Sequence, residues 1–145
     1  MNYVKTHPQE LESAYAYTAR DGTCKFSSAS GKVAVKTVAT VTARSAAQLK
    51  AAIATGPTSV TVEADRSVFQ QYRSGVLNSS ACGTSLDHAI TAVGYGTDAS
   101  AGDYYIVRNS WGASWGNKGY INIAAVEGTV GICGIQQTSV WPTTN

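Results

Sequence analysis

The second half of this 145-residue chain is a series of short runs of β-branched and aromatic residues separated by glycines, and this pattern limits the folds open to it. Runs of this length and composition favour strands over helices, and the glycines favour tight turns between them. The sequence therefore predicts an α+β fold with an antiparallel, barrel-like sheet and short helices. The strands expected in this half are residues 89–95, 104–108, 119–123 and 135–140.

The first half adds two strands and one helix. Residues 33–41 and 59–64 are rich in β-branched residues at period two, so both segments predict strands. Between them, Ser45 is a typical N-cap for a short amphipathic helix at 45–54, which should end before Gly56. The helix face expected to be buried carries Ala46, Leu49, Ile53 and Ala54.

Composition argues against several classes of function. With 43% hydrophobic and 14% charged residues, the chain can bury a core and is unlike a disordered segment. A formal charge of +2 without a stripe of lysine and arginine argues against a nucleic-acid partner. No run of about 18 apolar residues is present, so no membrane partner is expected. We expect neither a cofactor nor a metal site.

Two residues of the glycine-rich half have the chemistry of a catalytic pair, namely His88 and Asn109. A histidine that activates a nucleophile needs another group to fix its tautomer and orientation. A side-chain amide can do this without adding a charge. The alternative is a purely structural histidine on a strand.

The segments around this pair decide between the two interpretations. They are Leu86-Asp87-His88-Ala89-Ile90, Ala92-Val93-Gly94-Tyr95-Gly96, Tyr104-Tyr105-Ile106-Val107, Asn109-Ser110-Trp111-Gly112, Trp115-Gly116-Asn117-Lys118-Gly119-Tyr120 and Gly131-Ile132-Cys133-Gly134. In this order and spacing they resemble the C-terminal half of a papain-family, cathepsin-like cysteine protease. Several agreeing motifs are more specific than one, and they favour a functional His88.

The resemblance implies a cysteine nucleophile roughly 130 to 150 residues before the histidine and asparagine. Only 87 residues precede His88, and none of the three cysteines lies in a Cys-Gly-Ser-Cys-Trp-like context. We therefore expect residues 1–145 to be the C-terminal portion of a papain-like domain, with the nucleophile on an N-terminal half before Met1. The chain alone is then expected to be inactive, and that N-terminal half is its expected partner.

By the same resemblance, His88 is the general base toward the thiol and then the general acid toward the leaving amine. Asn109 bonds the ring nitrogen that faces away from the nucleophile, and Trp111 shields that bond from water. For Trp111, plain core packing is compatible with shielding. Asp87 could tune the charged pair or be a solvated loop residue, and the sequence leaves both open.

Substrate contacts are implied by the resemblance alone. Thr61, Ala89 and Thr138 match positions that line the main specificity pocket of the family, while Asp87 and Trp111 border the leaving-group side of the cleft. Such a pocket takes an apolar side chain, and Thr61 is more polar than the usual occupant. A peptide or protein substrate is expected, with its subsite preference open.

The resemblance also implies a disulfide between Cys82 and Cys133, and it leaves Cys24 to pair with a cysteine of the N-terminal half. The alternative is three reduced cysteines in a cytosolic domain. A disulfide favours an oxidising compartment, so a secreted or lysosomal/vacuolar location is expected. The glycosylation sequon at Asn78 suits secretion.

Three functions compete at this point. The first is a cysteine-type endopeptidase to which this chain supplies the histidine and asparagine. The second is a non-catalytic papain-like structural or assembly component without the nucleophile. In the third, Cys24 or Cys82 is an alternative nucleophile, although neither has the expected helix-start context.

Overall fold

The computed structural model describes residues 2–144, and its internal contacts divide the chain into two compact units. The larger unit is Thr40–Trp141. The smaller unit comprises the N-terminal residues up to Ala39 together with those from Pro142 on. Every predicted site residue except Cys24 belongs to the larger unit.

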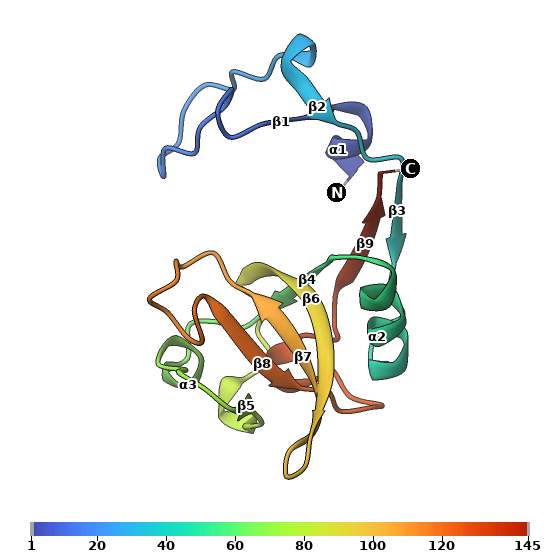
Figure 1. The fold of residues 1–145 in the computed structure, drawn as a ribbon, viewed down its shortest axis with the longest axis vertical. Helices are drawn as coiled ribbons and strands as arrows, with labels where there is room; N and C mark the ends of the chain where they lie inside the picture. Colours follow the sequence, from blue (N-terminus) through green and yellow to red (C-terminus); the bar gives the residue numbers. More distant parts are fainter. Residues whose placement is uncertain (1, 145) are drawn as a thin grey trace. The chain divides into compact units, whose positions relative to one another are not determined.

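A seven-stranded sheet in the order β3-β9-β4-β6-β7-β8-β5 forms the framework on which the site is built (Figure 1). The neighbours from β9 through β4, β6 and β7 to β8 are antiparallel, whereas β5 runs parallel to β8. The strands are β3 (Thr37–Thr40), β4 (Thr58–Val62), β5 (Val76–Leu77), β6 (His88–Asp98), β7 (Gly102–Arg108), β8 (Tyr120–Ala124) and β9 (Ser139–Thr143).

The α+β prediction is confirmed, and the sheet is mixed and open. A barrel would require the edge strands β3 and β5 to pair with each other. Within the described residues they do not, and β5 offers only two residues for pairing. The sheet that was expected to be antiparallel and barrel-like is therefore not closed into a barrel, and its last strand pair is parallel.

Most strands lie where the sequence predicts them, but two differ, one in each half of the chain. The last one begins at Ser139 rather than near residue 135, because Ile132–Gly134 form the 3-10 helix η3. The predicted strand at 33–41 is interrupted between β2 (Gly31–Val33) and β3. β2 pairs with β1 (Gln9–Glu10) and β3 neighbours β9, so the two halves of that segment have different partners.

Helix α2 (Ala46–Thr55) begins where predicted and contacts β6. The Ser45 side chain accepts a hydrogen bond from Gln48 N at 3.2 Å, which satisfies one free amide of the first turn. Ala54 is exposed, contrary to prediction, because one residue beyond Ile53 is a rotation of about 100° around the helix. The residues it buries are Ala46, Leu49, Ala52 and Ile53.

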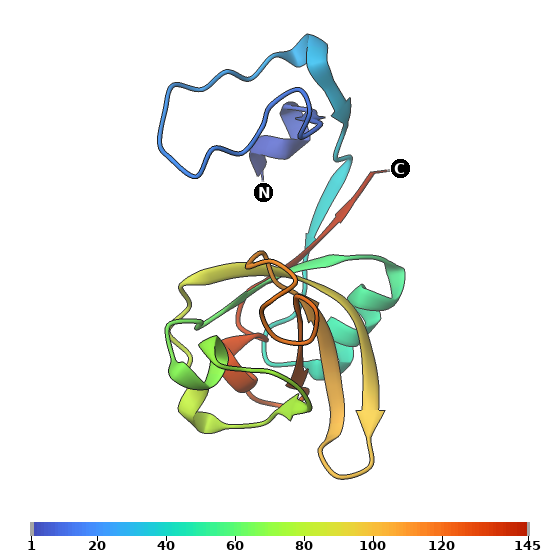
Figure 2. The same ribbon diagram turned by 60° about the vertical axis from the view of Figure 1, so that its left-hand side comes forward.

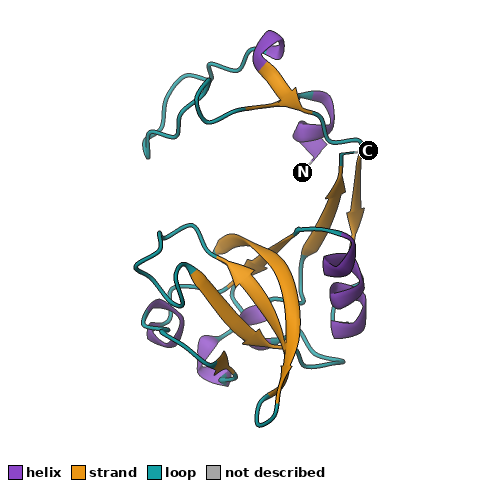
Figure 3. Ribbon diagram, viewed as in Figure 1, coloured by secondary structure: helices purple, strands orange, loops and turns teal. Residues whose placement is uncertain are grey.

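The core of the larger unit joins α2, the short helix α3 (Ser67–Gln70) and the sheet (Figure 3). Along β4 the burial alternates, so that Thr61 lies on the face opposite Val60 and Val62. The largest fully buried side chains are Tyr105, Phe69, Leu49, Ile121, Ile123 and Ile135.

The smaller unit contains helix α1 (Asn2–Thr6), β1, the 3-10 helix η1 (Ser28–Ser30) and β2, with a long loop between β1 and η1 (Figure 2). None of residues 3–39 is buried. Tyr3 stacks on His7 with ring centroids 3.9 Å apart, and Phe26 meets the His7 ring edge-on at 5.2 Å. Local aromatic contacts therefore take the place of a core in this unit.

Candidate active site

His88 and Asn109 come together because two strands place them at the same end of the sheet. His88 is the first residue of β6, and Asn109 directly follows β7. The two strands are antiparallel neighbours, so the start of one lies beside the end of the other. His88 Nε2 and Asn109 Oδ1 are 2.9 Å apart. The two residues of the predicted pair are thus within hydrogen-bond distance.

The backbone determines which atom of the Asn109 amide faces His88. Ser110 N donates a hydrogen bond to the same Asn109 atom at 2.7 Å, and a backbone N–H needs an acceptor. That atom is therefore the oxygen Oδ1, and His88 Nε2 must carry the proton that it donates to Oδ1. A neutral His88 then has Nδ1 available as an acceptor, which is the state that a general base requires.

The Trp111 ring lies against His88. Its ring stacks on the His88 ring with centroids 5.1 Å apart and an interplanar angle of 25°. Phe69 and Trp115 hold Trp111 by edge-to-face contacts at 5.5 and 5.3 Å. Asn109 is only 7% exposed, whereas Trp111 is 39% exposed. Trp111 thus packs on aromatic neighbours and lies against the His88 ring, and its shielding of the hydrogen bond from water stays a prediction.

Asp87 is anchored to the end of β4. Its side-chain oxygen Oδ1 accepts a hydrogen bond from Ala64 N at 2.7 Å, and its own N–H donates to Val62 O at 3.1 Å. These bonds join the residue before His88 to the neighbouring strand. Asp87 is exposed but bonded to the backbone, and its influence on a charged pair stays a prediction.

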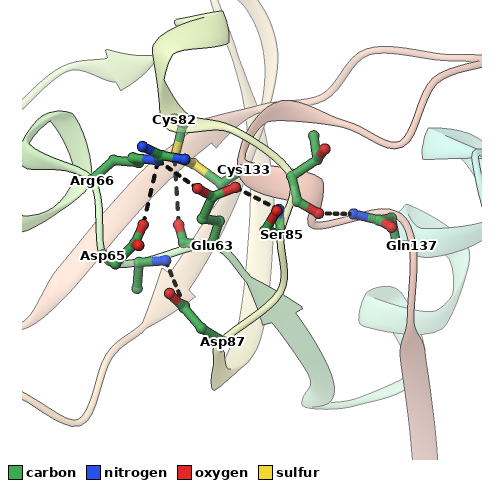
Figure 4. A network of polar contacts seen from close by, with 10 residues as sticks. Glu63, Asp65, Arg66, Cys82, Ser85, Asp87, Cys133 and Gln137 are labelled. Carbon is green, nitrogen blue, oxygen red and sulfur yellow. Dashed lines mark hydrogen bonds and ion pairs between the residues drawn. A yellow bond between two sulfur atoms is a disulfide. The ribbon is translucent and has the colours of Figure 1, made fainter.

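The loop before His88 also covers a buried charge that the sequence analysis missed (Figure 4). Glu63 directly follows β4 and is 1% exposed. Its carboxylate accepts a hydrogen bond from Ser85 N and pairs with the Arg66 guanidinium. The Ser85 amide, and after it Arg66, hold the pKa of Glu63 below its ordinary value. The available sequence signal was an acidic residue three positions before an arginine.

Thr61, Ala89 and Thr138 gather at one place beside this pair. Thr61 and Ala89 face each other across β4 and β6, and the Thr61 hydroxyl donates to Thr138 O at 3.1 Å. Ala89 directly follows His88 in β6. Because the Thr61 hydroxyl donates its proton to Thr138 O, this surface has one free hydrogen-bond donor fewer than the sequence suggests.

The disulfide between Cys82 and Cys133 is confirmed, with Cα atoms 4.9 Å apart and both residues buried. Three reduced cysteines are therefore excluded, and Cys82 as an alternative nucleophile is wrong because its sulfur is already bonded. In the described structure Cys24 is an exposed, free cysteine of the smaller unit. Its pairing with an N-terminal half stays a prediction.

Neither a metal-binding cluster nor a helix able to cross a membrane occurs within residues 2–144. Across this range, no three His, Cys, Asp or Glu side chains gather closely enough to hold a metal ion. No helix in the same range has the length and apolar character that a membrane crossing needs.

The sequence matches a family profile described as papain family cysteine protease over residues 1–143. Papaya proteinase 4 of Carica papaya is 40% identical over 100% of this chain and 42% of its own length. Probable cysteine protease RD21B of Arabidopsis thaliana is 43% identical over 96% of this chain and 30% of its own length. The chain thus spans less than half the length of these two relatives.

Solved structures show the same similarity in the fold. The structure of the bromelain protease from Ananas comosus in complex with the E64 inhibitor has a TM-score of 0.89 and 39% identity. The match covers 99% of this chain and 67% of the bromelain chain. The Carica candamarcensis cysteine protease CMS1MS2 in complex with E-64 has a TM-score of 0.87 and 37% identity, over 99% and 66% of the two chains.

Proposed function

Because this chain belongs to the papain family of cysteine proteases, we propose that it supplies the histidine and asparagine of a Cys-His-Asn endopeptidase. The observation that carries the proposal is the hydrogen bond between His88 and Asn109. Its direction follows from the Ser110 amide, and the Trp111 ring stacks on the His88 ring. This arrangement leaves Nδ1 of a neutral His88 ready to accept a proton.

In the proposed reaction, His88 Nδ1 takes the proton of a cysteine thiol and becomes an imidazolium. The thiolate sulfur then bonds to the carbonyl carbon of the scissile peptide. As the carbon–nitrogen bond breaks, the imidazolium gives its proton to the leaving amine. Water hydrolyses the resulting thioester while His88 again accepts a proton, and the thiol is restored. Asn109 holds the ring in one orientation through both stages.

The thiol is proposed to come from an N-terminal half of the same enzyme. Cys82 and Cys133 are bonded to each other, and Cys24 belongs to the smaller unit. The donors that stabilise the developing oxyanion are assigned to that half as well. In this proposal the chain alone is inactive, and Cys24 is its point of disulfide attachment to the N-terminal half.

The proposed substrate is a peptide or protein. Thr61, Ala89 and Thr138 form the proposed specificity surface, because they lie together directly beside His88. Asp87 and Trp111 are assigned to the leaving-group side. The disulfide supports a secreted or lysosomal/vacuolar location, because disulfides persist in oxidising compartments.

The test is peptide hydrolysis by the intact protein that contains this chain. His88→Ala should lower kcat/KM by about 10²- to 10⁴-fold, because no other group takes over the proton transfer. Asn109→Ala should leave measurable activity, since losing an orienting hydrogen bond costs about 1 to 3 kcal/mol, or roughly tenfold to hundredfold in rate.

His7→Ala is the matched control, because His7 is the second histidine and lies in the smaller unit. Its activity should equal that of the wild type. Wild-type rates in His88→Ala would refute the proposal, whereas an intact wild-type protein without peptidase activity would favour a non-catalytic papain-like component. Hydrolysis by the isolated chain that depends on Cys24 would refute the assignment of the nucleophile to another segment.

A further inference from the structure

The loop between the disulfide and His88, residues 83–87, is tied to the rest of the larger unit at three points. Thr84 O accepts a hydrogen bond from Gln137 Nε2 at 2.7 Å. Ser85 N donates to the Glu63 carboxylate. Asp87 exchanges two hydrogen bonds with the end of β4. Among these contacts, the Ser85 bond is the one in which the loop backbone bonds to a charged side chain.

Glu63 lies under this loop with almost no access to solvent. Its side chain is 2% exposed, whereas that of its ion-pair partner Arg66 is 55% exposed. Gly83 has a left-handed φ of 74°, and a Cβ there would collide with the Glu63 carboxylate. The loop thus approaches the carboxylate more closely than a residue with a Cβ could.

The backbone of Glu63 is fixed by the disulfide region. Glu63 N donates to Cys133 O at 2.9 Å, and Glu63 O lies 3.6 Å from Cys82 Sγ. The preceding residue, Val62, faces His88 across β4 and β6. Glu63 therefore connects the disulfide, the end of β4 and the loop that leads into His88.

Both carboxylate oxygens of Glu63 have a partner. Oε2 receives the Ser85 amide, and Oε1 faces Arg66 Nε at 2.5 Å. A hydrogen bond from a backbone amide to a buried carboxylate is stronger than one between neutral groups. Removing the carboxylate would leave the Ser85 N–H without its partner and would loosen the loop next to His88.

We propose that Glu63 is a positioning residue for His88, because its buried carboxylate ties the loop backbone at Ser85 to β4 and so holds the imidazole in register with Asn109. This assignment rests on the proposed function only where it concerns catalysis. The position of the ring can be measured whether or not the protein hydrolyses peptides.

The test uses the intact protein with ¹⁵N-labelled histidine in four forms: wild type, Glu63→Ala, Glu63→Gln and Arg66→Gln. In Glu63→Ala, the His88 Nε2–H signal should shift and exchange faster with solvent, while the His7 signals stay unchanged as an internal reference. Glu63→Gln keeps an oxygen acceptor for Ser85 N and should restore most of the wild-type spectrum. Arg66→Gln keeps the carboxylate and should leave the His88 signals in place.

Activity is the second measurement. Glu63→Ala should lower kcat by about tenfold to hundredfold with KM within about twofold, the loss expected for a misplaced catalytic group. Unchanged His88 signals in a folded Glu63→Ala protein would overturn the proposal. If that variant does not fold, Glu63→Asp decides, because it draws the charge back by one methylene, and unchanged His88 signals there would equally overturn it. A wild-type protein without peptidase activity would refute the proposed function alone, because the spectra still report the position of the ring.

Discussion

The two units of this chain differ in how they are held together. The larger unit contains all of the buried hydrophobic residues in the described part of the chain, a disulfide and the His88–Asn109 pair. The smaller unit buries none of residues 3–39, and it leaves Tyr17 84% and Leu11 51% exposed. The proposed site therefore lies on the part of the chain that has its own core. Substitutions of the same kind in the two units should therefore have unequal effects on stability.

The largest difference in the free energy of unfolding is expected between removing the disulfide and replacing Cys24. Replacing Cys82 and Cys133 together by alanine should lower the free energy of unfolding by about 4 kcal/mol, because a chain-entropy treatment assigns about this value to a loop of such length. In a protein of residues 1–145 alone, Cys24→Ser should change it by less than about 0.5 kcal/mol, since Cys24 is exposed and unbonded in the described structure. Urea denaturation of the three proteins measures both values. Equal losses would contradict the comparison.

A matched pair of leucines tests the core directly. Leu49 of α2 is 1% exposed, whereas Leu11 of the smaller unit is 51% exposed. Leu49→Ala should cost about 3 kcal/mol through lost burial and the cavity left behind. Leu11→Ala should stay within about 0.5 kcal/mol of the wild type. A loss above about 2 kcal/mol for Leu11→Ala, again by urea denaturation, would show a core in the smaller unit.

Two serines, Ser45 and Ser27, allow the stability effect of a single hydrogen bond to be compared between the two units. Ser45 caps α2 through its side chain, whereas Ser27 precedes η1 without a side-chain cap bond. Ser45→Ala should lower the free energy of unfolding by about 1 kcal/mol. Ser27→Ala should have no measurable effect. Thermal unfolding followed by circular dichroism distinguishes the two, and a reversed order would contradict the assignment of the cap.

The smallest effect on stability is expected for Asp98, and it depends on pH. Asp98 at the end of β6 accepts hydrogen bonds from Ser100 N and Ala101 N, both at 2.8 Å. The Ala101 amide, followed by that of Ser100, lowers the pKa of Asp98 below its ordinary value of 3.8. The stability that this carboxylate contributes is therefore fully present above that value and is lost as the pH falls through the lowered pKa.

Asp98→Asn should accordingly be slightly less stable than the wild type near neutral pH, with a gap that closes in acid. Asp21→Asn in the smaller unit is the control, because within residues 2–144 the Asp21 side chain makes no hydrogen bond, and this variant should be as stable as the wild type near neutral pH. Melting temperatures measured from about pH 7 down to about pH 2.5 test this. A gap that widens in acid would contradict the sign.

Local patterns in the sequence predicted the regular elements well. The cap at Ser45, the helix after it and the strands β4, β6, β7 and β8 follow from residue types within a few positions of one another. The family and the disulfide followed from ordered motifs and from cysteine positions that match it. Such information is contained in short segments, so it can be read without knowing which segments meet in space.

Contacts between distant segments decided the rest. The open sheet depends on which strands meet at its edges, and the buried state of Glu63 depends on a loop that begins some twenty residues later. Thr61 loses its free hydroxyl proton to Thr138, 77 residues away. The papain-like order of the histidine and the asparagine is evident from the sequence alone. That the amide oxygen faces the ring and that Nε2 carries the proton required the folded structure, because this orientation depends on how the end of β7 meets the start of β6.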